Sequence, residues 1–142
     1  MLKSIVLLSK ISSLSSKRSV VLVDDDGDIL TVLKRALELH NYEVHAFSDP
    51  VKARDYLRSV KSPQILISDI RMPGVSGFEL ARETCTLHPE MKIMLLTSFE
   101  IERHEFHRVF PSTRIDALIN KPIGIGRFID AVNALIVTDR TR

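Results

Sequence analysis

The sequence predicts an α/β domain in which helices cover both faces of a parallel sheet of five strands. Short apolar runs alternate along the chain with segments whose apolar residues recur at helical spacing. The clearest strand candidate, Val20–Val23, is apolar at every position, which is typical of a strand buried on both faces. Strands that alternate with helices in this way indicate a parallel, doubly wound sheet.

Two strand–helix pairs are expected in the first part of the chain. The strand at residues 20–23 precedes a helix over 26–40, where apolar side chains recur on one face. A second strand is expected over 42–47. Residues 48–50, Ser-Asp-Pro, then begin a helix that runs to about residue 60, because they offer a capping side chain and a proline in the first turn.

The third pair surrounds a turn rich in glycine and proline. Residues 65–67 form a strand that ends at Asp69, and the turn follows over 72–77. A helix is expected over 78–88, ended by Pro89, because the residue before a proline disfavours helical backbone.

Two more strands complete the sheet. The fourth is expected at 93–96 and the fifth at 117–119, with a highly charged helix over 100–110 between them and a last helix over 126–137. In a doubly wound sheet the functional site lies at the carboxyl ends of the strands, beside the point where the strand order reverses.

The composition is that of one soluble domain and excludes several classes of protein. The chain has 142 residues, 44% hydrophobic and 27% charged, which rules out wholesale disorder. A net charge of +2 argues against direct binding of nucleic acid, and no apolar run is long enough to span a membrane. The single cysteine, Cys85, is interpreted as a small buried helix residue, and a reducing, cytoplasmic location is expected.

Residues 1–18 differ from the remainder, 19–142. They are rich in serine and basic residues, and Leu7, Ile11 and Leu14 share one helical face. We interpret them as a mobile or weakly docked extension rather than a membrane-surface or organelle-targeting segment.

Polar side chains suited to binding a metal ion and a phosphoryl group follow the strands at their carboxyl ends: Asp24, Asp25, Asp26, Asp69, Thr97 and Lys121. Carboxylates brought together there would repel one another, and a hard divalent cation would neutralise them. A lysine and a hydroxyl beside such a site can bind phosphoryl oxygens.

Four motifs resemble the receiver domain of two-component response regulators: Val-Leu-Val-Asp-Asp-Asp at 21–26, Ser-Asp-Ile-Arg-Met-Pro-Gly at 68–74, Leu-Leu-Thr-Ser at 95–98 and Asn-Lys-Pro-Ile at 120–123. The resemblance covers about residues 19–138 and is specific because four motifs occur in order, each at a strand end. It implies a flavodoxin-like fold with strand order 2-1-3-4-5, in the single-domain form of a chemotaxis-like regulator.

The resemblance implies that Asp69 accepts a phosphoryl group from a histidine kinase or a phosphotransfer protein. Thr97 and Lys121 would hold the phosphoryl oxygens. The domain would not be an enzyme beyond its own phosphorylation and dephosphorylation.

The resemblance also implies a Mg²⁺ site. Asp25 would bind the ion directly and Asp24 through water, with Asp69 and the backbone carbonyl of Arg71 as further ligands.

The chain ends shortly after the last predicted helix, which leaves no room for a DNA-binding output domain unless the chain is a fragment. Output is therefore expected through contact with a downstream protein, on the face formed by residues 100–110, 117–119 and 126–137. A homodimer is compatible with the sequence.

The sequence departs from the family at three places. Leu118 stands where the family commonly has Tyr or Phe, Arg114 and Ile115 replace a usual Gly-Ala, and Ser98 replaces a usual alanine. The acceptor chemistry is expected to be intact and the readout altered, because leucine has no ring to rotate.

Two other functions are compatible with these residues. A pseudo-receiver would bind partners without phosphorylation, and Leu118 favours it. A Mg²⁺-dependent phosphatase of the haloacid dehalogenase type would place its nucleophile at Asp24, since Asp24 and Asp26 fit its Asp-x-Asp pattern, but it would leave Asp69 without a role.

Several other candidate residues have simpler interpretations. Asp26 is expected to cap a helix, and Gly74 and Gly77 to serve a turn. Glu100, His104 and His107 share a helical face that is interpreted as solvated rather than as a metal site.

Overall fold

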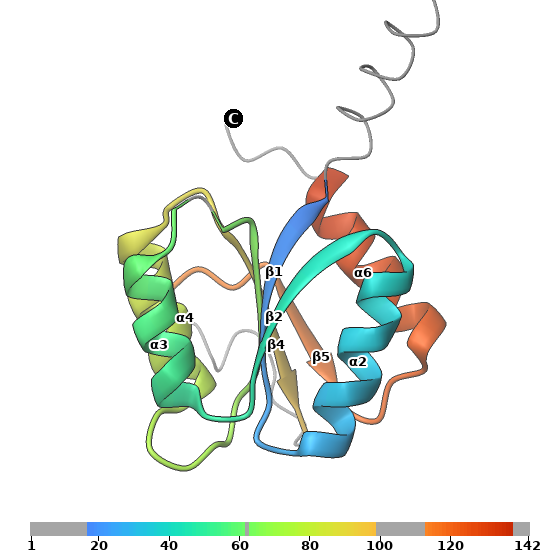
Figure 1. The fold of residues 1–142 in the computed structure, drawn as a ribbon, viewed down its shortest axis with the longest axis horizontal. Coiled ribbons are helices and arrows are strands. Elements are labelled where there is room, and N and C mark those ends of the chain that lie inside the picture. Colours follow the sequence, from blue (N-terminus) through green and yellow to red (C-terminus); the bar gives the residue numbers. More distant parts are fainter. Residues whose placement is uncertain (1–16, 62, 99–112, 138–142) are drawn as a thin grey trace, which may run out of the picture.

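The computed structural model describes residues 17–61, 63–98 and 113–137. Its helices and strands are β1 (Arg18–Val23), α2 (Gly27–Leu39), β2 (Tyr42–Phe47), α3 (Pro50–Ser59), β3 (Ile65–Asp69), α4 (Gly77–Leu87), β4 (Lys92–Thr97), β5 (Ala117–Asn120) and α6 (Ile125–Val137). The strands form one parallel sheet in the order β2-β1-β3-β4-β5, which confirms the predicted topology. Figure 1 shows the sheet between two pairs of helices.

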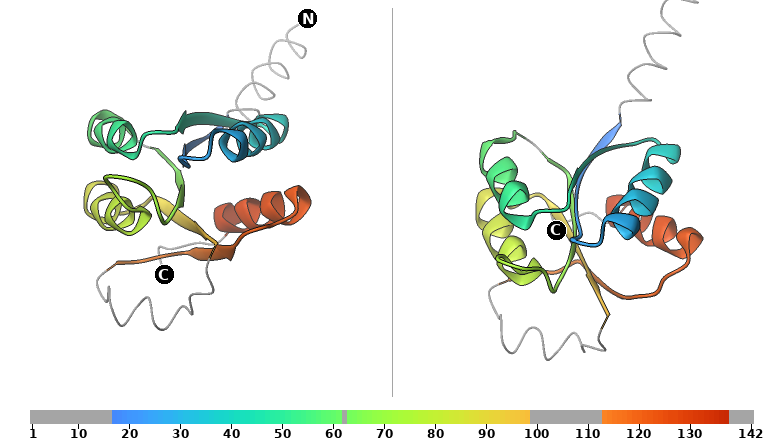
Figure 2. Two further views of the ribbon diagram at one scale, coloured as in Figure 1. Left: turned by 90° about the horizontal axis from the view of Figure 1, so that it is seen from below. Right: turned by 60° about the horizontal axis from the view of Figure 1, so that its bottom comes forward.

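The helices divide between the two faces of the sheet. Helices α2 and α6 cover one face and α3 and α4 the other, as Figure 2 shows from two further directions. Each buried strand contributes alternate side chains to the two cores, so that Leu22 of β1 packs toward α2 and α6 while Val21 packs toward α3 and α4. Burial on both faces explains why these strands are almost entirely apolar.

Capping side chains determine where three helices begin. Asp26 caps α2, Asp49 caps α3 with Pro50 as the first helical residue, and Ser76 caps α4. Helix α4 therefore begins at Gly77, one residue before the predicted start, because the Ser76 hydroxyl accepts a hydrogen bond from the backbone N–H of Glu79.

The first strand begins earlier than predicted. Arg18 pairs with Tyr42 and belongs to β1, so the boundary expected after residue 18 lies within the strand. Residues 1–16 of the predicted extension lie outside the described residues, as does the predicted charged helix 100–110 with Glu100, His104 and His107.

Cys85 of α4 is half-buried rather than fully buried. Its Sγ lies 3.5 Å from the backbone carbonyl oxygen of Arg114 and its side chain packs against the α3/α4 core, which agrees with a packing role. Among the residues that the structure describes, no helix has the length and apolar character needed to cross a membrane.

Candidate metal centre at the carboxyl ends of the strands

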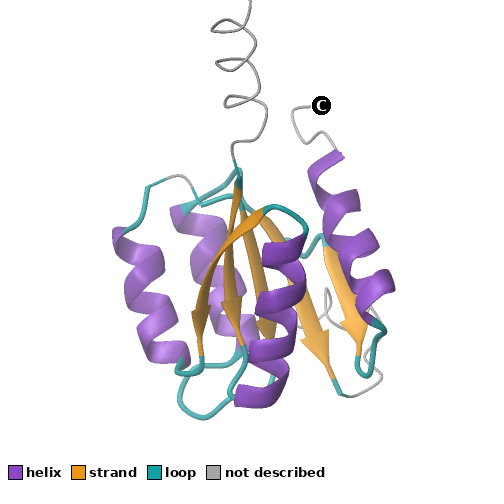
Figure 3. Cartoon of the chain, turned by 45° about the vertical axis from the view of Figure 1, so that its right-hand side comes forward, coloured by secondary structure: helices purple, strands orange, loops and turns teal. Residues whose placement is uncertain are grey.

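The sheet order brings three carboxylates together. Strands β1 and β3 are neighbours, with Val23 opposite Ser68, so Asp24 and Asp69 lie side by side where these strands end. Oxygen atoms of Asp24, Asp25 and Asp69 all lie within 4.8 Å of one another. The loops that follow the strands meet at the lower edge of the sheet in Figure 3, which is the edge predicted to hold the site.

Lys121 reaches this cluster from the end of β5. Its ammonium donates a hydrogen bond of 2.7 Å to Asp24 Oδ2 and lies 3.3 Å from Asp69 Oδ1. The backbone N–H of Lys121 donates to the carbonyl oxygen of Thr97 at 2.6 Å, which ties the lysine to the end of β4. The structure thus places Lys121 between two of the three acids predicted for the site.

Burial differs among the candidate residues. Asp24 is fully buried, Asp69 and Thr97 are buried, and Asp25 is exposed. Because a buried carboxylate needs partners, both oxygens of Asp24 are engaged: Oδ1 accepts from the backbone N–H of Asp26 and Oδ2 accepts from Lys121. Asp25 is the acid through which the cluster meets solvent.

The electrostatics of the site follow from this burial. Burial raises the pKa of Asp69 above its usual range, and the charge of Asp24 raises it further, against the opposing effect of Lys121. For Lys121, burial alone lowers the pKa, but the hydrogen bond and charge of Asp24 together with Asp69 outweigh it, so its pKa is raised. The lysine is therefore charged, and Asp69 carries a cost for being ionised.

Asp26 does not share in the cluster. Its carboxylate accepts hydrogen bonds from the backbone N–H groups of Asp28 and Ile29, at 3.0 and 3.2 Å. This confirms its predicted role as a helix cap.

The two turn glycines have different physical requirements. Gly74 has φ +88°, the left-handed backbone conformation that favours glycine, which confirms the prediction for it. Gly77 instead is the first residue of α4 and lies against the end of β3: a Cβ there would be 2.2 Å from the Asp69 carbonyl oxygen and 2.9 Å from Ile70 Cα. Gly77 is therefore a positioning residue of the site, and sequence reasoning missed it because close approach between two backbones leaves no local pattern.

Hydrogen bonds fix the backbone around Asp69. The Ser68 hydroxyl donates to the Asp69 carbonyl oxygen at 2.8 Å, and the N–H of Ile70 donates to the Leu96 carbonyl oxygen at 3.0 Å. The N–H of Gly77 donates to the Ile70 carbonyl oxygen at 2.8 Å, which joins the start of α4 to the end of β3. Three hydrogen bonds thus hold the backbone of Asp69 and Ile70 in place between β4 and α4.

The donor set fits a magnesium ion. Mg²⁺ prefers oxygen ligands and is usually bound by one or two carboxylates together with water. The cluster offers three carboxylates within reach of one ion, with Asp25 open to solvent. Arg71 is exposed and lies two residues after the end of β3, and its carbonyl stays a predicted ligand.

Comparison with known proteins decides the family. The model of the response regulator receiver domain matches residues 20–133, which is most of the chain. The chain belongs to the response regulator receiver domain family. The family assignment, the α/β fold and the strand order predicted from the sequence are therefore all confirmed.

Relatives of this receiver domain include regulators of different lengths. The response regulator receiver protein CpdR of Brucella abortus is 37% identical over 83 residues, which cover 58% of this chain and 68% of CpdR. The C4-dicarboxylate transport transcriptional regulatory protein DctD of Rhizobium meliloti is 38% identical over 84 residues, 59% of this chain. The match spans only 18% of the length of DctD.

Solved structures share the fold. The response regulator TrrA of Thermotoga maritima, solved in complex with Mg²⁺ and beryllofluoride, is 27% identical, with a TM-score of 0.72. The match covers 83% of this receiver domain and 98% of TrrA.

Leu118 stands inside this fold at the middle of β5. It lies opposite Leu95 of β4 and packs, half-buried, against the α3/α4 core, whereas its neighbours Ala117 and Ile119 face the α2/α6 core. Leu118 is thus on the strand that pairs directly with β4, and β4 ends at Thr97.

Proposed function

We propose that this receiver domain accepts a phosphoryl group on Asp69 from a histidine kinase or a phosphotransfer protein, in a reaction that depends on Mg²⁺. The convergence of Asp24, Asp25 and Asp69 with Lys121 at one edge of the sheet carries the proposal. We place this domain in the cytoplasm, because its single cysteine, Cys85, is free and the fold needs no oxidising compartment.

In this reaction an Asp69 carboxylate oxygen attacks the phosphorus atom of a phosphohistidine. The bond between phosphorus and the histidine nitrogen breaks, and an acyl phosphate forms on Asp69. Lys121, 3.3 Å from Asp69, supplies a positive charge for the phosphoryl oxygens, and the buried Thr97 supplies a hydroxyl.

Magnesium would be held by Asp25 and Asp69, with Asp24 acting through water and the Arg71 carbonyl as a further ligand. When bound, the ion neutralises charge that develops on the phosphoryl oxygens. Lys121 already occupies one oxygen of Asp24, so the lysine and the ion share the negative charge of the same cluster.

The test is direct phosphorylation of the full chain. We expect incubation with Mg²⁺ and acetyl phosphate to add one phosphoryl group, located at Asp69 by peptide mass spectrometry, and beryllofluoride to give the matching adduct. A chain that forms neither adduct with Mg²⁺ present would be a pseudo-receiver. An adduct on Asp24 would indicate the phosphatase instead, although both oxygens of Asp24 are already hydrogen-bonded.

Mg²⁺ should stabilise the fold through this site. A ligand that binds only the folded state at about ten times its Kd adds roughly 1.4 kcal/mol to the free energy of unfolding. We expect Asp25→Asn to remove most of this gain, because it deletes a direct anionic ligand. Lys121→Met should have the opposite effect and increase Mg²⁺ affinity, because it removes the cation that competes for Asp24.

Thermal unfolding with and without Mg²⁺ measures both effects. An Asp25→Asn variant whose melting temperature rises with Mg²⁺ as much as that of the wild type would show that Asp25 is not a ligand.

We further propose that output passes through a protein contact on β5, α6 and the residues between β4 and β5. Leu118 fills less space than an aromatic ring, so it distinguishes less between the two signalling states, and only a difference in interaction energy between states moves their balance. We expect Leu118→Tyr to strengthen the response to beryllofluoride.

Amide chemical-shift changes over residues 100–130 measure this response. Leu118→Ile, which keeps an aliphatic side chain, is the matched control and should respond like the wild type. If the wild type already switches completely and the Tyr variant responds no differently, Leu118 does not weaken the readout.

A further inference from the structure

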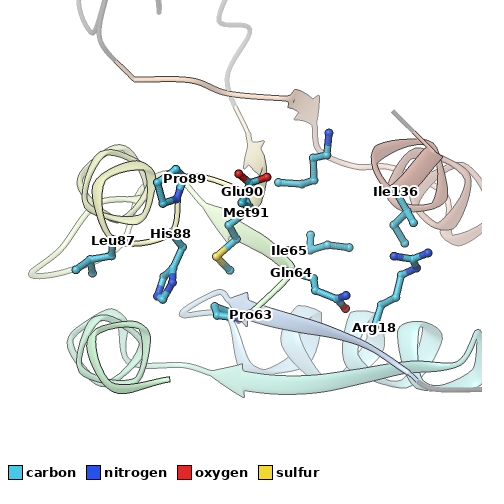
Figure 4. Close-up of a pocket in the computed structure, with 11 residues that line it drawn as sticks. Arg18, Pro63, Gln64, Ile65, Leu87, His88, Pro89, Glu90, Met91 and Ile136 are labelled. Atoms are coloured by element: carbon cyan, nitrogen blue, oxygen red, sulfur yellow. The ribbon is translucent and has the colours of Figure 1, made fainter. Parts of the chain in front are cut away.

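A cavity of about 500 Å³ opens at the amino-terminal edge of the sheet (Figure 4). Asp69, the last residue of β3, lies at the opposite edge. It lies where β1, β3 and β4 begin and where α4 and α6 end. We call it the amino-edge cavity; it is lined by Arg18, Pro63, Gln64, Ile65, Leu87, His88, Pro89, Glu90, Met91, Lys92 and Ile136.

Much of this lining is apolar. Ile65 and Met91 are buried at its base, and Leu87 at the end of α4 is 42% exposed. Val137, next to the lining residue Ile136, is 85% exposed. Hydrophobic side chains grouped around an open cavity are typical of a surface that another chain segment covers.

The residues that precede β1 begin beside this cavity. Arg18 is both the first residue of β1 and part of the lining, so the residues before it start at the rim. Leu14 is four positions before Arg18 and can lie at most about 14 Å from it, since an extended residue spans roughly 3.5 Å. Leu14 is therefore joined to the rim of the cavity by only a short stretch of chain.

We propose that the amino-edge cavity binds apolar side chains of residues 1–16 of the same chain, with Leu14 and Ile11 as its principal ligands. Leu7, Ile11 and Leu14 recur at the spacing of one helical face, and the residues between Ile11 and Leu14 are serines. A directly attached segment meets its site at an effective concentration in the millimolar range, so modest contacts suffice.

The other segment near the cavity, residues 138–142, is less suited to fill it than residues 1–16. Residues 138–142, which follow α6 nearby, read Thr-Asp-Arg-Thr-Arg and offer no large apolar side chain. The charged groups of the lining have both signs, since Glu90 is negative and Arg18 and Lys92 are positive, so apolar contact rather than charge selects the ligand.

The first test changes the segment in the full chain. Leu14→Gln and Ile11→Gln remove one apolar side chain each, and Ser13→Gln and Ser12→Gln are the matched controls. We expect the first pair to shift the NMR methyl signals of Leu87 and Met91 and to speed tryptic cleavage after Lys10 by roughly tenfold, about the effect of losing one partly buried aliphatic side chain. The controls should do neither, and Met94, in the core under α2 and α6, should not shift.

The second test changes the cavity. Leu87→Gln removes a lining side chain at the last residue of α4, and Leu39→Gln makes the same change at the last residue of α2, where the leucine is 67% exposed. We expect only Leu87→Gln to speed cleavage after Lys10.

Two outcomes overturn the proposal. One is that the segment and cavity variants change neither the methyl signals nor the cleavage rate relative to their controls. The other is that the changes depend on protein concentration, which would show that a second copy occupies the cavity. Neither readout involves phosphorylation, so this result is independent of the function proposed for Asp69.

Discussion

Asp69→Asn should abolish phosphorylation by acetyl phosphate while leaving the domain folded. The amide cannot act as the nucleophile. In the described part of the chain, no other carboxylate at the end of β3 lies beside Lys121 and the acids that follow β1. Asp26→Asn is the matched control. It makes the same chemical change two residues beyond Asp24, where asparagine caps a helix as well as aspartate does.

The measurement is the phosphorylated fraction by intact-protein mass spectrometry, with circular dichroism to establish folding. Phosphorylation of Asp69→Asn at the wild-type level would contradict the assignment. Loss of phosphorylation in Asp26→Asn as well would show that Asp26 acts on the site and not only on α2.

Asp69→Asn should also be more stable than the wild type at neutral pH without Mg²⁺, by on the order of 1 kcal/mol, because it removes one of three adjacent negative charges. The pKa of Asp69 is raised in the folded state, so its ionisation costs stability above its ordinary pKa of 3.8. Below that pH Asp69 is protonated in both the folded and the unfolded state, so the difference in stability between the variant and the wild type should vanish. Urea unfolding across this pH range in the presence of a chelator checks the sign.

Gly77→Ala should destabilise the domain by about 3 kcal/mol and impair phosphorylation. The added Cβ would lie 2.2 Å from the Asp69 carbonyl oxygen, and its other close neighbours are backbone atoms of Asp69 and Ile70. Backbone cannot move aside as a flexible side chain can, so the start of α4 and the end of β3 must separate. The movement would shift Asp69 relative to Lys121.

Gly27→Ala is a closely matched control for this prediction. Gly27 is also the first residue of a helix and also follows a capping side chain, but a Cβ there meets nothing within 4 Å. It should be neutral or stabilise by up to about 1 kcal/mol, because alanine loses less conformational freedom on folding. Equal losses for the two variants in urea unfolding would mean that glycine is needed for backbone conformation and not for close approach.

The order of the helices and strands and the candidate residues at the strand ends could be predicted from the amino-acid sequence. Apolar runs such as Val20–Val23 identify buried strands, and Asp26 and Asp49 identify helix starts, because these signals depend only on neighbouring residues. The strand-end acids and the lysine can be grouped from their positions in the sequence, because parallel strands all end at one edge of the sheet.

How these side chains contact one another could not be predicted from the sequence. The ion pair of Lys121 with Asp24 joins residues 97 positions apart, and its geometry depends on the packing of β5 at the far side of the sheet from β2. Glycine is needed at position 77 because α4 contacts the backbone of Asp69. The amino-edge cavity forms where the ends of strands and helices that are distant in the chain lie together. Contacts of this kind depend on three-dimensional packing, which no local sequence pattern records.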